Sequence, residues 1–148
     1  MKTMGSTIID APLEKVWSLL RDYGGLTKWF SGVVSCGIAD GKSSDQIGAV
    51  RVVSQTPGGP GIGERLTEMS DDDHLFAYRI EVPVDLGSVK VACGSRGRVR
   101  LVEITHGSGT FIEWTHDSDV IEGDPHVLSD FYKQVYGAFF RDLQKFFK

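Results

Sequence analysis

Hydrophobic residues recur at helical spacing over the C-terminal part of the chain. Asp124 and Pro125 suit a helix start, because aspartate accepts hydrogen bonds from free backbone amides and proline needs no amide donor in the first turn. Tyr132 and Tyr136 flank an apolar stripe that continues to the end of the sequence. The stripe consists of Val127, Leu128, Phe131, Val135, Phe139, Leu143 and Phe146. This pattern predicts one helix of about 22 residues, roughly 33 Å long.

A shorter helical pattern lies near the N-terminus. A brief apolar stretch at 6–9 predicts a first strand, and Asp10 and Pro12 follow it with helix-start chemistry, in which Asp10 is the expected cap. Apolar residues then recur at helical spacing as far as Leu20, and two glycines soon interrupt them. A second short helix is expected at 26–30.

Between 31 and 120 the sequence changes to short runs rich in Val, Ile, Thr and Tyr, separated by clusters of Gly, Asp, Ser and Pro. This alternation is typical of a meander of antiparallel strands. The fifth interval is long, and its two glycines, Gly94 and Gly97, predict a bend or a bulge. Strands are expected near 32–39, 47–55, 62–70, 74–82, 87–103 and 109–120.

This order of elements predicts an α+β fold, in which a curved antiparallel sheet of about seven strands wraps around the long C-terminal helix. No repeat and no long linker divides the 148 residues, so we expect one domain spanning 1–148. Side chains cannot fill such a curved sheet completely near its open end. The fold therefore predicts a cavity that holds a ligand.

Composition and charge narrow the function. The net charge is −4 and no basic stripe stands out, so nucleic acid is not expected as a partner. No apolar run is long enough for a signal sequence or a membrane span, and we expect a cytoplasmic protein without membrane insertion. Cys36 and Cys93 lack metal-binding spacing and are expected as small buried hydrophobes. The histidines are isolated from one another, so neither a metal nor another cofactor is expected.

Four motifs together resemble a known superfamily. They are IIDAPLEKVWSLLRDYGGLTKW, then GAVRVV followed by GERLTEMSDDDHLFAYRI, then GTFIEWTHD, and finally the amphipathic helix. In this order they resemble the SRPBCC or START-like helix-grip superfamily, which includes START lipid-transfer domains, polyketide cyclases and dehydratases, birch-pollen-allergen-like proteins and abscisic acid receptors. The resemblance covers essentially the whole chain. It implies an internal cavity for a polyketide, lipid or aromatic ligand, but the shared fold does not determine the activity.

The motifs GAVRVV and GERL also look like the central region of plant lachrymatory factor synthases, where an Arg and a Glu lie on neighbouring strands. By this resemblance Arg51 and Glu64 are the candidate catalytic pair. A guanidinium can hold an oxyanion, and a desolvated carboxylate can transfer a proton. The segment 82–94 lacks the tyrosine of those synthases, which disfavours a sulfenic acid substrate. The alternative is an ordinary cross-strand ion pair.

Strand alternation places Tyr78 and Trp114 on inward faces, and His116 shares the face of Trp114. A histidine there is either an acid or base near neutral pH, or a polar residue satisfied at the end of a strand. The predicted ligand-binding set is Tyr78, Ile112, Trp114, His116, Phe131, Tyr132, Val135 and Phe139. For every aromatic residue in this set the alternative is plain core packing.

A loop rich in glycine and proline joins the third and fourth predicted strands. It lacks the Lys-Ser/Thr of a phosphate-binding loop, and it does not open a helix. Its position resembles the gate loop of abscisic acid receptors, so we expect a mobile flap over the cavity mouth. The predicted gate consists of Pro57, Gly58, Gly59, Pro60 and Gly61.

Three functions remain open at this point. The first is a carrier or sensor that buries a small hydrophobic or amphipathic molecule. The second is a cofactor-independent cyclase, dehydratase or isomerase, for which Arg51 and Glu64 must face the cavity. The third is a protein interaction module, which predicts a filled cavity and a large exposed apolar patch. The chain is expected to be a monomer or a homodimer.

Overall fold

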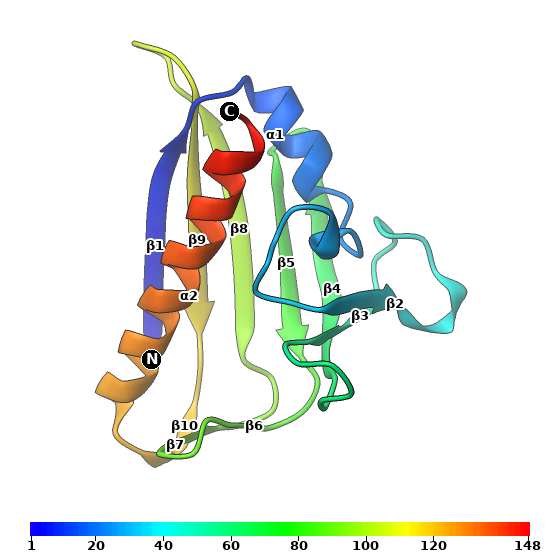
Figure 1. Ribbon diagram of the computed structural model, residues 1–148, viewed down its shortest axis with the longest axis vertical. Coiled ribbons are helices and arrows are strands. Elements are labelled where there is room, and N and C mark those ends of the chain that lie inside the picture. The colour runs from blue at the N-terminus through cyan, green and yellow to red at the C-terminus, as the bar shows by residue number, and fades with distance from the viewer.

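The computed structural model describes residues 1–148 and shows a curved antiparallel sheet wrapped around one long helix (Figure 1). Seven strands form this main sheet in the order β1-β9-β8-β5-β4-β3-β2. Their bounds are β1 (Lys2–Ile9), β2 (Ser35–Ile38), β3 (Val50–Ser54), β4 (Ile62–Ser70), β5 (Leu75–Ile80), β8 (Arg96–Glu103) and β9 (Thr110–Asp117). The predicted α+β helix-grip fold is confirmed.

Three short strands form a second sheet in the order β10-β7-β6. They are β6 (Val84–Asp85), β7 (Val89–Val91) and β10 (Val120–Gly123), and they lie below the main sheet in Figure 1. The interval predicted at 87–103, with a bend at Gly94 and Gly97, is two strands: the chain leaves one sheet after β7 and enters the other at β8. Gly94 lies in this turn with φ of 97°, a left-handed conformation that glycine adopts without strain.

The first helix, α1 (Leu13–Leu20), begins later than expected. Pro12 is its N-cap in an extended conformation, and no side chain caps the helix, so the predicted role of Asp10 as cap is wrong. The extended backbone at Pro12 delays the first helical turn beyond the reach of Asp10. A short 3₁₀ helix (Leu26–Lys28) stands where a helix was expected at 26–30, and another 3₁₀ turn covers Ala39–Gly41.

The long helix α2 (Pro125–Phe146) has the 22 residues that the pattern predicts, and Asp124 accepts a hydrogen bond from the His126 amide at 2.9 Å. Its buried face, however, lies to one side of the predicted stripe. Val127 and Phe146 are exposed, and the buried residues are Leu128, Tyr132, Tyr136, Phe139, Phe140 and Leu143. The tyrosines are buried because distant strands supply partners for their hydroxyl groups.

The packed core surrounds the C-terminal half of α2. The ring of Phe139 lies 4.7 Å from Trp29 and 4.5 Å from Trp114, measured between ring centroids. Gly5 on β1 lets α2 approach the sheet, since a Cβ atom there would meet the ring of Tyr136 at 2.6 Å. Neither helix is both long and apolar enough to cross a membrane.

Candidate ligand-binding site

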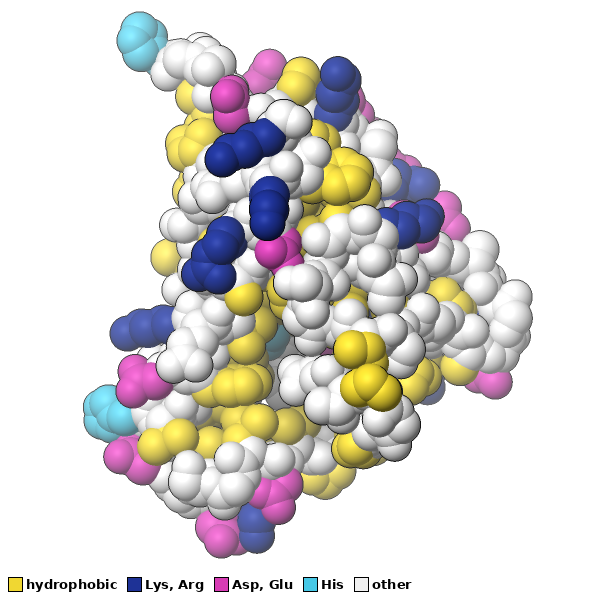
Figure 2. Space-filling view, viewed as in Figure 1, with side chains coloured by type: hydrophobic (Ala, Val, Ile, Leu, Met, Phe, Trp, Pro, Cys, Tyr) yellow, Lys and Arg dark blue, Asp and Glu magenta, His cyan; other side chains and the backbone are white.

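A cavity of about 310 Å³ lies where the N-terminal half of α2, the main sheet and the small sheet meet. Hydrophobic residues make up 12 of the 18 that line it. Figure 2 shows a hollow on this side of the molecule with hydrophobic side chains gathered around it. The apolar wall consists of Val53, Ile62, Ile80, Val84, Leu86, Val91, Leu128, Phe131 and Val135. A mainly apolar molecule is the occupant that such walls favour.

Strand β3 directs Arg51 toward the cavity side of the sheet. Successive side chains of a strand point to opposite faces, and Ala49 and Val53 are buried on the same face as Arg51. Val52, between them, is exposed on the outer face. The antiparallel register sets Arg51 directly opposite Glu64 of β4.

Arg51 and Glu64 form a buried ion pair. The Nε atom of Arg51 donates to Oε1 of Glu64 at 2.6 Å, and Nη1 donates to the backbone carbonyl of Tyr23 at 3.2 Å. The guanidinium also lies 4.0 Å above the ring of Tyr23 and 5.1 Å from that of Tyr78, within cation–π range. Glu64 lines the cavity and Arg51 does not. Arg51 therefore holds Glu64 in place from behind.

The positive charge of Arg51 is stable. Burial opposes the charge on Arg51, but the neighbouring Glu64 carboxylate outweighs it, and the pKa of Arg51 rises above its ordinary value. Only one carboxylate oxygen is engaged, because Oε2 of Glu64 accepts no hydrogen bond from the protein. Glu64, a lining residue of the cavity, thus keeps one carboxylate oxygen free to accept a hydrogen bond.

A chain of hydrogen bonds runs from the cavity to β1, the edge strand of the main sheet. The Tyr78 hydroxyl lies 2.9 Å from Nε2 of His116 and accepts from Nε1 of Trp114 at 3.1 Å. Nδ1 of His116 lies 2.7 Å from the Tyr136 hydroxyl, which in turn lies 2.9 Å from Oγ1 of Thr3. Every donor and acceptor in the chain has a partner, so the chain holds its rings in fixed positions.

Gly97 makes this chain possible. On the inner face of the sheet it stands between Tyr78 on β5 and His116 on β9. A Cβ atom at Gly97 would collide with the ring of Tyr78. Because glycine has no side chain, the Tyr78 ring can lie across β8 and reach the histidine.

His116 and Tyr78 are neutral near physiological pH. Burial, with a smaller effect from the charge of Arg51, lowers the pKa of His116 from 6.5 to about 3. Burial, with a further contribution from Glu64, raises the pKa of Tyr78 well above 10.0. Neither group exchanges a proton readily at neutral pH, which favours the alternative of a satisfied polar residue for His116.

Further polar contacts complete the base of the cavity. The Tyr132 ring stacks on His116 with centroids 4.1 Å apart, and its hydroxyl lies 3.3 Å from Oγ of Ser118. Ser118 is in turn 2.6 Å from Oγ of Ser95. No buried side-chain nitrogen or oxygen lacks a partner. The polar base is therefore already organised without a ligand.

The predicted ligand-binding residues divide into two groups. Six of them line the cavity: Tyr78, Trp114, His116, Phe131, Tyr132 and Val135. Ile112 and Phe139 do not line it, because they belong to the packed core beside it. The alternation of side chains along a strand predicts which face of the sheet a residue occupies. It does not predict where along α2 the packed core ends and the cavity begins.

The predicted gate loop touches the cavity at one residue only. Pro60 lines the cavity, together with Gln55 and Thr56 before the loop. Pro57, Gly58, Gly59 and Gly61 do not line it. Asp85 and the other lining residues of the small sheet were also missed. Two of the missed residues could have been found from strand alternation. Val53 lies two residues from Arg51 and Ile80 lies two residues from Tyr78, so each points to the same face of the sheet as its predicted neighbour.

The other candidate histidine and the two cysteines lie outside the cavity. No group of three or more His, Cys, Asp or Glu side chains is arranged to hold a metal. His74 lies 2.8 Å from Glu14 on the surface. Cys36 is partly exposed and Cys93 is exposed, so the expectation that both are buried is wrong. Cys93 lies in the turn between the two sheets, next to the bend predicted at Gly94.

Comparison with known proteins agrees with this geometry. The model of the family described as polyketide cyclase/dehydrase and lipid transport matches residues 2–146. The chain belongs to this family. The predicted superfamily resemblance is thereby confirmed. The family includes proteins that act on or carry hydrophobic molecules, and an apolar cavity suits both activities.

Solved structures share the whole fold. A protein from Nitrosospira multiformis is 23% identical with a TM-score of 0.82, covering 100% of this chain and 97% of that one. XoxI from Bacillus cereus is 23% identical with a TM-score of 0.81, covering 99% and 94%. A protein from Bacillus thuringiensis is 22% identical with a TM-score of 0.82, covering 99% and 98%. At these identities the likeness establishes the fold alone.

Proposed function

We propose that this protein binds a small, mainly apolar molecule that carries a hydroxyl group, and that it acts as a carrier or sensor. The observation that carries the proposal is the cavity itself, with apolar walls and the free Oε2 of Glu64. An ion-paired carboxylate is a strong acceptor for a ligand hydroxyl in an apolar site. The ligand buries its frame against the walls and donates to Glu64.

The size of the cavity restricts the ligand. Ligand pockets span roughly 300–1,000 Å³, so a volume of about 310 Å³ is at the lower end of that range. Compact molecules such as two or three fused rings suit this space better than a long acyl chain. Phe131 and Val135 of α2 lie along one side, where they would contact the faces of such rings.

The pKa values of His116 and Tyr78 favour carriage or sensing over acid–base chemistry by these two groups. His116 has a pKa of about 3, and the pKa of Tyr78 lies well above 10.0. General acid–base catalysis works best with groups whose pKa lies near the working pH. Both groups instead serve as fixed, neutral hydrogen-bonding partners.

A matched pair of probes tests the proposal. Calorimetric titration with 2-naphthol and with naphthalene compares one apolar frame with and without a hydroxyl. A hydrogen bond to a charged group contributes about 1.5–3 kcal/mol, so 2-naphthol should bind about tenfold or more tightly. Glu64→Leu should remove this preference. Equal affinities of the two probes in the original protein contradict the role of Glu64.

A second pair of variants tests the location. Val53 lines the cavity and Val52 lies on the outer face of the same strand. Val53→Phe should fill the cavity and weaken 2-naphthol binding about tenfold or more, the equivalent of 1.4 kcal/mol. Val52→Phe should leave the affinity unchanged. Equal effects of the two variants would place the binding site elsewhere.

A cofactor-independent cyclase or dehydratase is the second candidate function, and one observation favours it. Glu64 lines the cavity and its Oε2 accepts no hydrogen bond from the protein, so this oxygen can accept a proton from a bound substrate. Mass spectrometry of a native ligand before and after incubation with the protein separates the two functions. An unchanged ligand supports carriage, and conversion that Glu64→Gln abolishes supports the enzyme. An interaction module is disfavoured because the cavity is not filled.

A further inference from the structure

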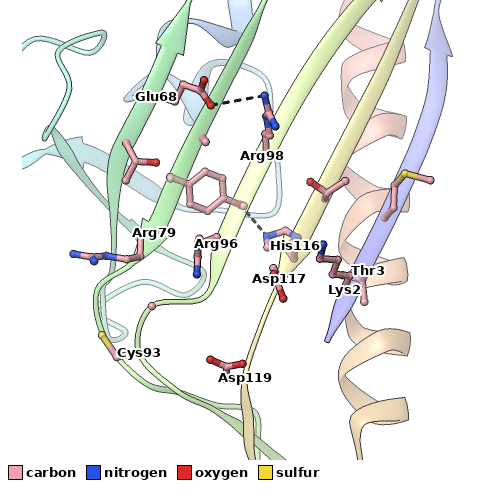
Figure 3. A pocket seen from close by; sticks show the side chains of 17 residues that line it. Lys2, Thr3, Glu68, Arg79, Cys93, Arg96, Arg98, His116, Asp117 and Asp119 are labelled. Carbon is pink, nitrogen blue, oxygen red and sulfur yellow. Dashed lines mark hydrogen bonds and ion pairs between the residues drawn. The ribbon is translucent and has the colours of Figure 1, made fainter.

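The hydrogen-bonded chain at the base of the cavity can run in either of two directions. Its members are Tyr78 of β5, His116 of β9, Tyr136 of α2 and Thr3 of β1. Figure 3 shows His116 and Thr3 on their strands, with a dashed line for the hydrogen bond between His116 and the Tyr78 hydroxyl. Each member carries one hydrogen to donate and can also accept. A member that donates to the next one therefore accepts from the one before it.

The tautomer of His116 sets the direction of the chain. Burial lowers the pKa of His116 from 6.5 to about 3, so the ring is neutral and only one of its nitrogens carries a hydrogen. In the first direction Nε2 accepts from Tyr78 and Nδ1 donates to Tyr136. In the second direction Nδ1 accepts from Tyr136 and Nε2 donates to Tyr78.

Trp114 links this choice to the cavity. Its indole nitrogen can only donate, so the Tyr78 oxygen accepts from it in both directions. Tyr78, Trp114 and His116 all line the cavity. In the first direction the hydroxyl hydrogen of Tyr78 is bound to His116. In the second direction both protein neighbours donate to the Tyr78 oxygen, and its hydrogen is left for a ligand.

The free protein and a ligand complex favour different directions. In the free protein, the second direction leaves the hydrogen of Tyr78 without a protein acceptor, and an unpaired buried donor is destabilising. The first direction gives every hydrogen a protein acceptor as far as Thr3, whose oxygen accepts from Tyr136. A ligand oxygen that accepts from Tyr78 removes the disadvantage of the second direction.

We propose that Tyr78 donates a hydrogen bond to a carbonyl oxygen of the ligand, and that this carbonyl reverses the chain as far as Thr3. The inference rests on the function proposed above and adds a second polar group to the ligand. Glu64 is directly opposite Ile80, two residues from Tyr78, so Glu64 and Tyr78 share one face of neighbouring strands. The ligand is therefore a compact apolar molecule with a hydroxyl group for Glu64 and a carbonyl group for Tyr78.

The reversal neither adds a proton to the protein nor removes one. The hydroxyl hydrogens of Tyr78, Tyr136 and Thr3 turn, and the hydrogen of His116 exchanges from Nδ1 to Nε2. The rings themselves keep their places, because the same pairs of atoms remain hydrogen-bonded in both directions.

Two probes of the same shape test the role of Tyr78. 2-Acetylnaphthalene has a carbonyl oxygen where 2-isopropenylnaphthalene has a methylene group. Calorimetric titration should show that the ketone binds about threefold to tenfold more tightly, as expected for one neutral hydrogen bond. Tyr78→Phe should remove this preference. Equal affinities of the two probes in the original protein would overturn the role of Tyr78.

Nitrogen NMR of the His116 ring follows the direction of the chain in the unaltered protein, where no substitution can disturb folding. We expect the hydrogen on Nδ1 in the free protein and in the hydrocarbon complex, and on Nε2 in the ketone complex. Any other pattern would overturn the reversal.

Thr3→Val tests the far end of the chain, outside the cavity. Valine cannot accept from Tyr136, so the first direction loses its last hydrogen bond, while in the second direction Tyr136 still donates to His116. The preference for the ketone over the hydrocarbon should therefore rise about twofold or more. Thr7→Val is the matched control, because Thr7 lies on the same face of β1 but contacts Gln144 instead. Equal preferences in the two variants would overturn the coupling to β1.

Failure of this inference differs from failure of the proposed function. If 2-naphthol binding responds to Val53→Phe while the ketone and the hydrocarbon bind equally, the cavity holds a ligand but Tyr78 does not donate to it. If none of the three probes binds, or Val53→Phe affects none of them, the proposed function fails as well.

Discussion

The two halves of α2 pack against the same sheet, but only one of them is fully packed. In the C-terminal half, Phe139 is buried among aromatic residues from the segment after α1 and from the sheet, and Leu143 is fully buried. In the N-terminal half, Phe131 and Val135 are partly exposed and face the cavity. The short strands of the small sheet cover this end incompletely. The candidate binding site therefore lies where the core is left unfilled.

The largest contrast is expected from truncating one aromatic residue in each half. Phe139→Ala should lower the free energy of unfolding by about 3–5 kcal/mol, because it leaves a void in a closely packed region. Phe131→Ala should cost about 1.5 kcal/mol or less, because the side chain already borders a cavity. Chemical denaturation measures both. Similar losses for the two variants would mean that the halves do not differ in packing.

The ion pair gives the next largest effect. Arg51→Met removes the partner of Glu64, and breaking a buried pair leaves an uncompensated charge that costs about 3 kcal/mol or more. Arg51→Met combined with Glu64→Leu should recover much of this loss, since apolar replacements of buried pairs are often tolerated. Denaturation of the single and double variants measures the recovery. A double variant no more stable than Arg51→Met would contradict this account of the pair.

The buried histidine predicts a loss of stability in acid. The pKa of His116 in the folded protein is about 3, below its ordinary 6.5, so between these pH values the unfolded chain binds a proton that the folded chain excludes. Stability should fall as pH drops below 6.5, by roughly 2 kcal/mol at pH 5, and this contribution should be absent at pH 8.

His116→Gln and its control His126→Gln isolate this effect, with unfolding free energies measured at pH 8 and pH 5. His126 is exposed at the start of α2, outside the buried chain of hydrogen bonds. His116→Gln should lower stability at both pH values but remove roughly 2 kcal/mol of the difference between them. His126→Gln should keep the difference found in the unaltered protein. The same pH dependence in both variants would show that His116 is not the group responsible.

A smaller loss of stability is expected at Gly97, the residue of β8 that leaves space for the Tyr78 ring. A Cβ atom at Gly97 would collide with the Tyr78 ring, so Gly97→Ala should cost about 1–2 kcal/mol and break the contact between Tyr78 and His116. Gly37 on β2 has open space at its Cβ position, and Gly37→Ala should be near neutral. Thermal denaturation compares the two. Equal shifts would show that the collision at Gly97 is relieved without cost.

Local signals in the sequence predicted the helix ends of α2, the inward face of Trp114 and the overall fold. Asp124 and Pro125 act on their immediate neighbours, so their effect can be read from a short window. The burial of Tyr136 could not be predicted in this way, and Tyr132, although predicted to line the cavity, was placed at the edge of the apolar stripe rather than at its centre. Their burial depends on Ser118, Thr3 and His116, which lie on strands far away in the sequence.

The boundary of the cavity also could not be predicted from the sequence. Ile112 and Trp114 share one face of β9, yet only Trp114 reaches the cavity. The difference depends on where the packing around α2 ends, and no periodicity carries that information.

The most direct test of the central claim is native mass spectrometry of the protein purified from its own cells, alongside Val53→Phe and Val52→Phe. The account predicts one small molecule bound per chain in the original protein and in Val52→Phe, and none in Val53→Phe. An unaltered protein that carries no small molecule, or a bound molecule that Val53→Phe retains in full, would contradict a ligand site in this cavity.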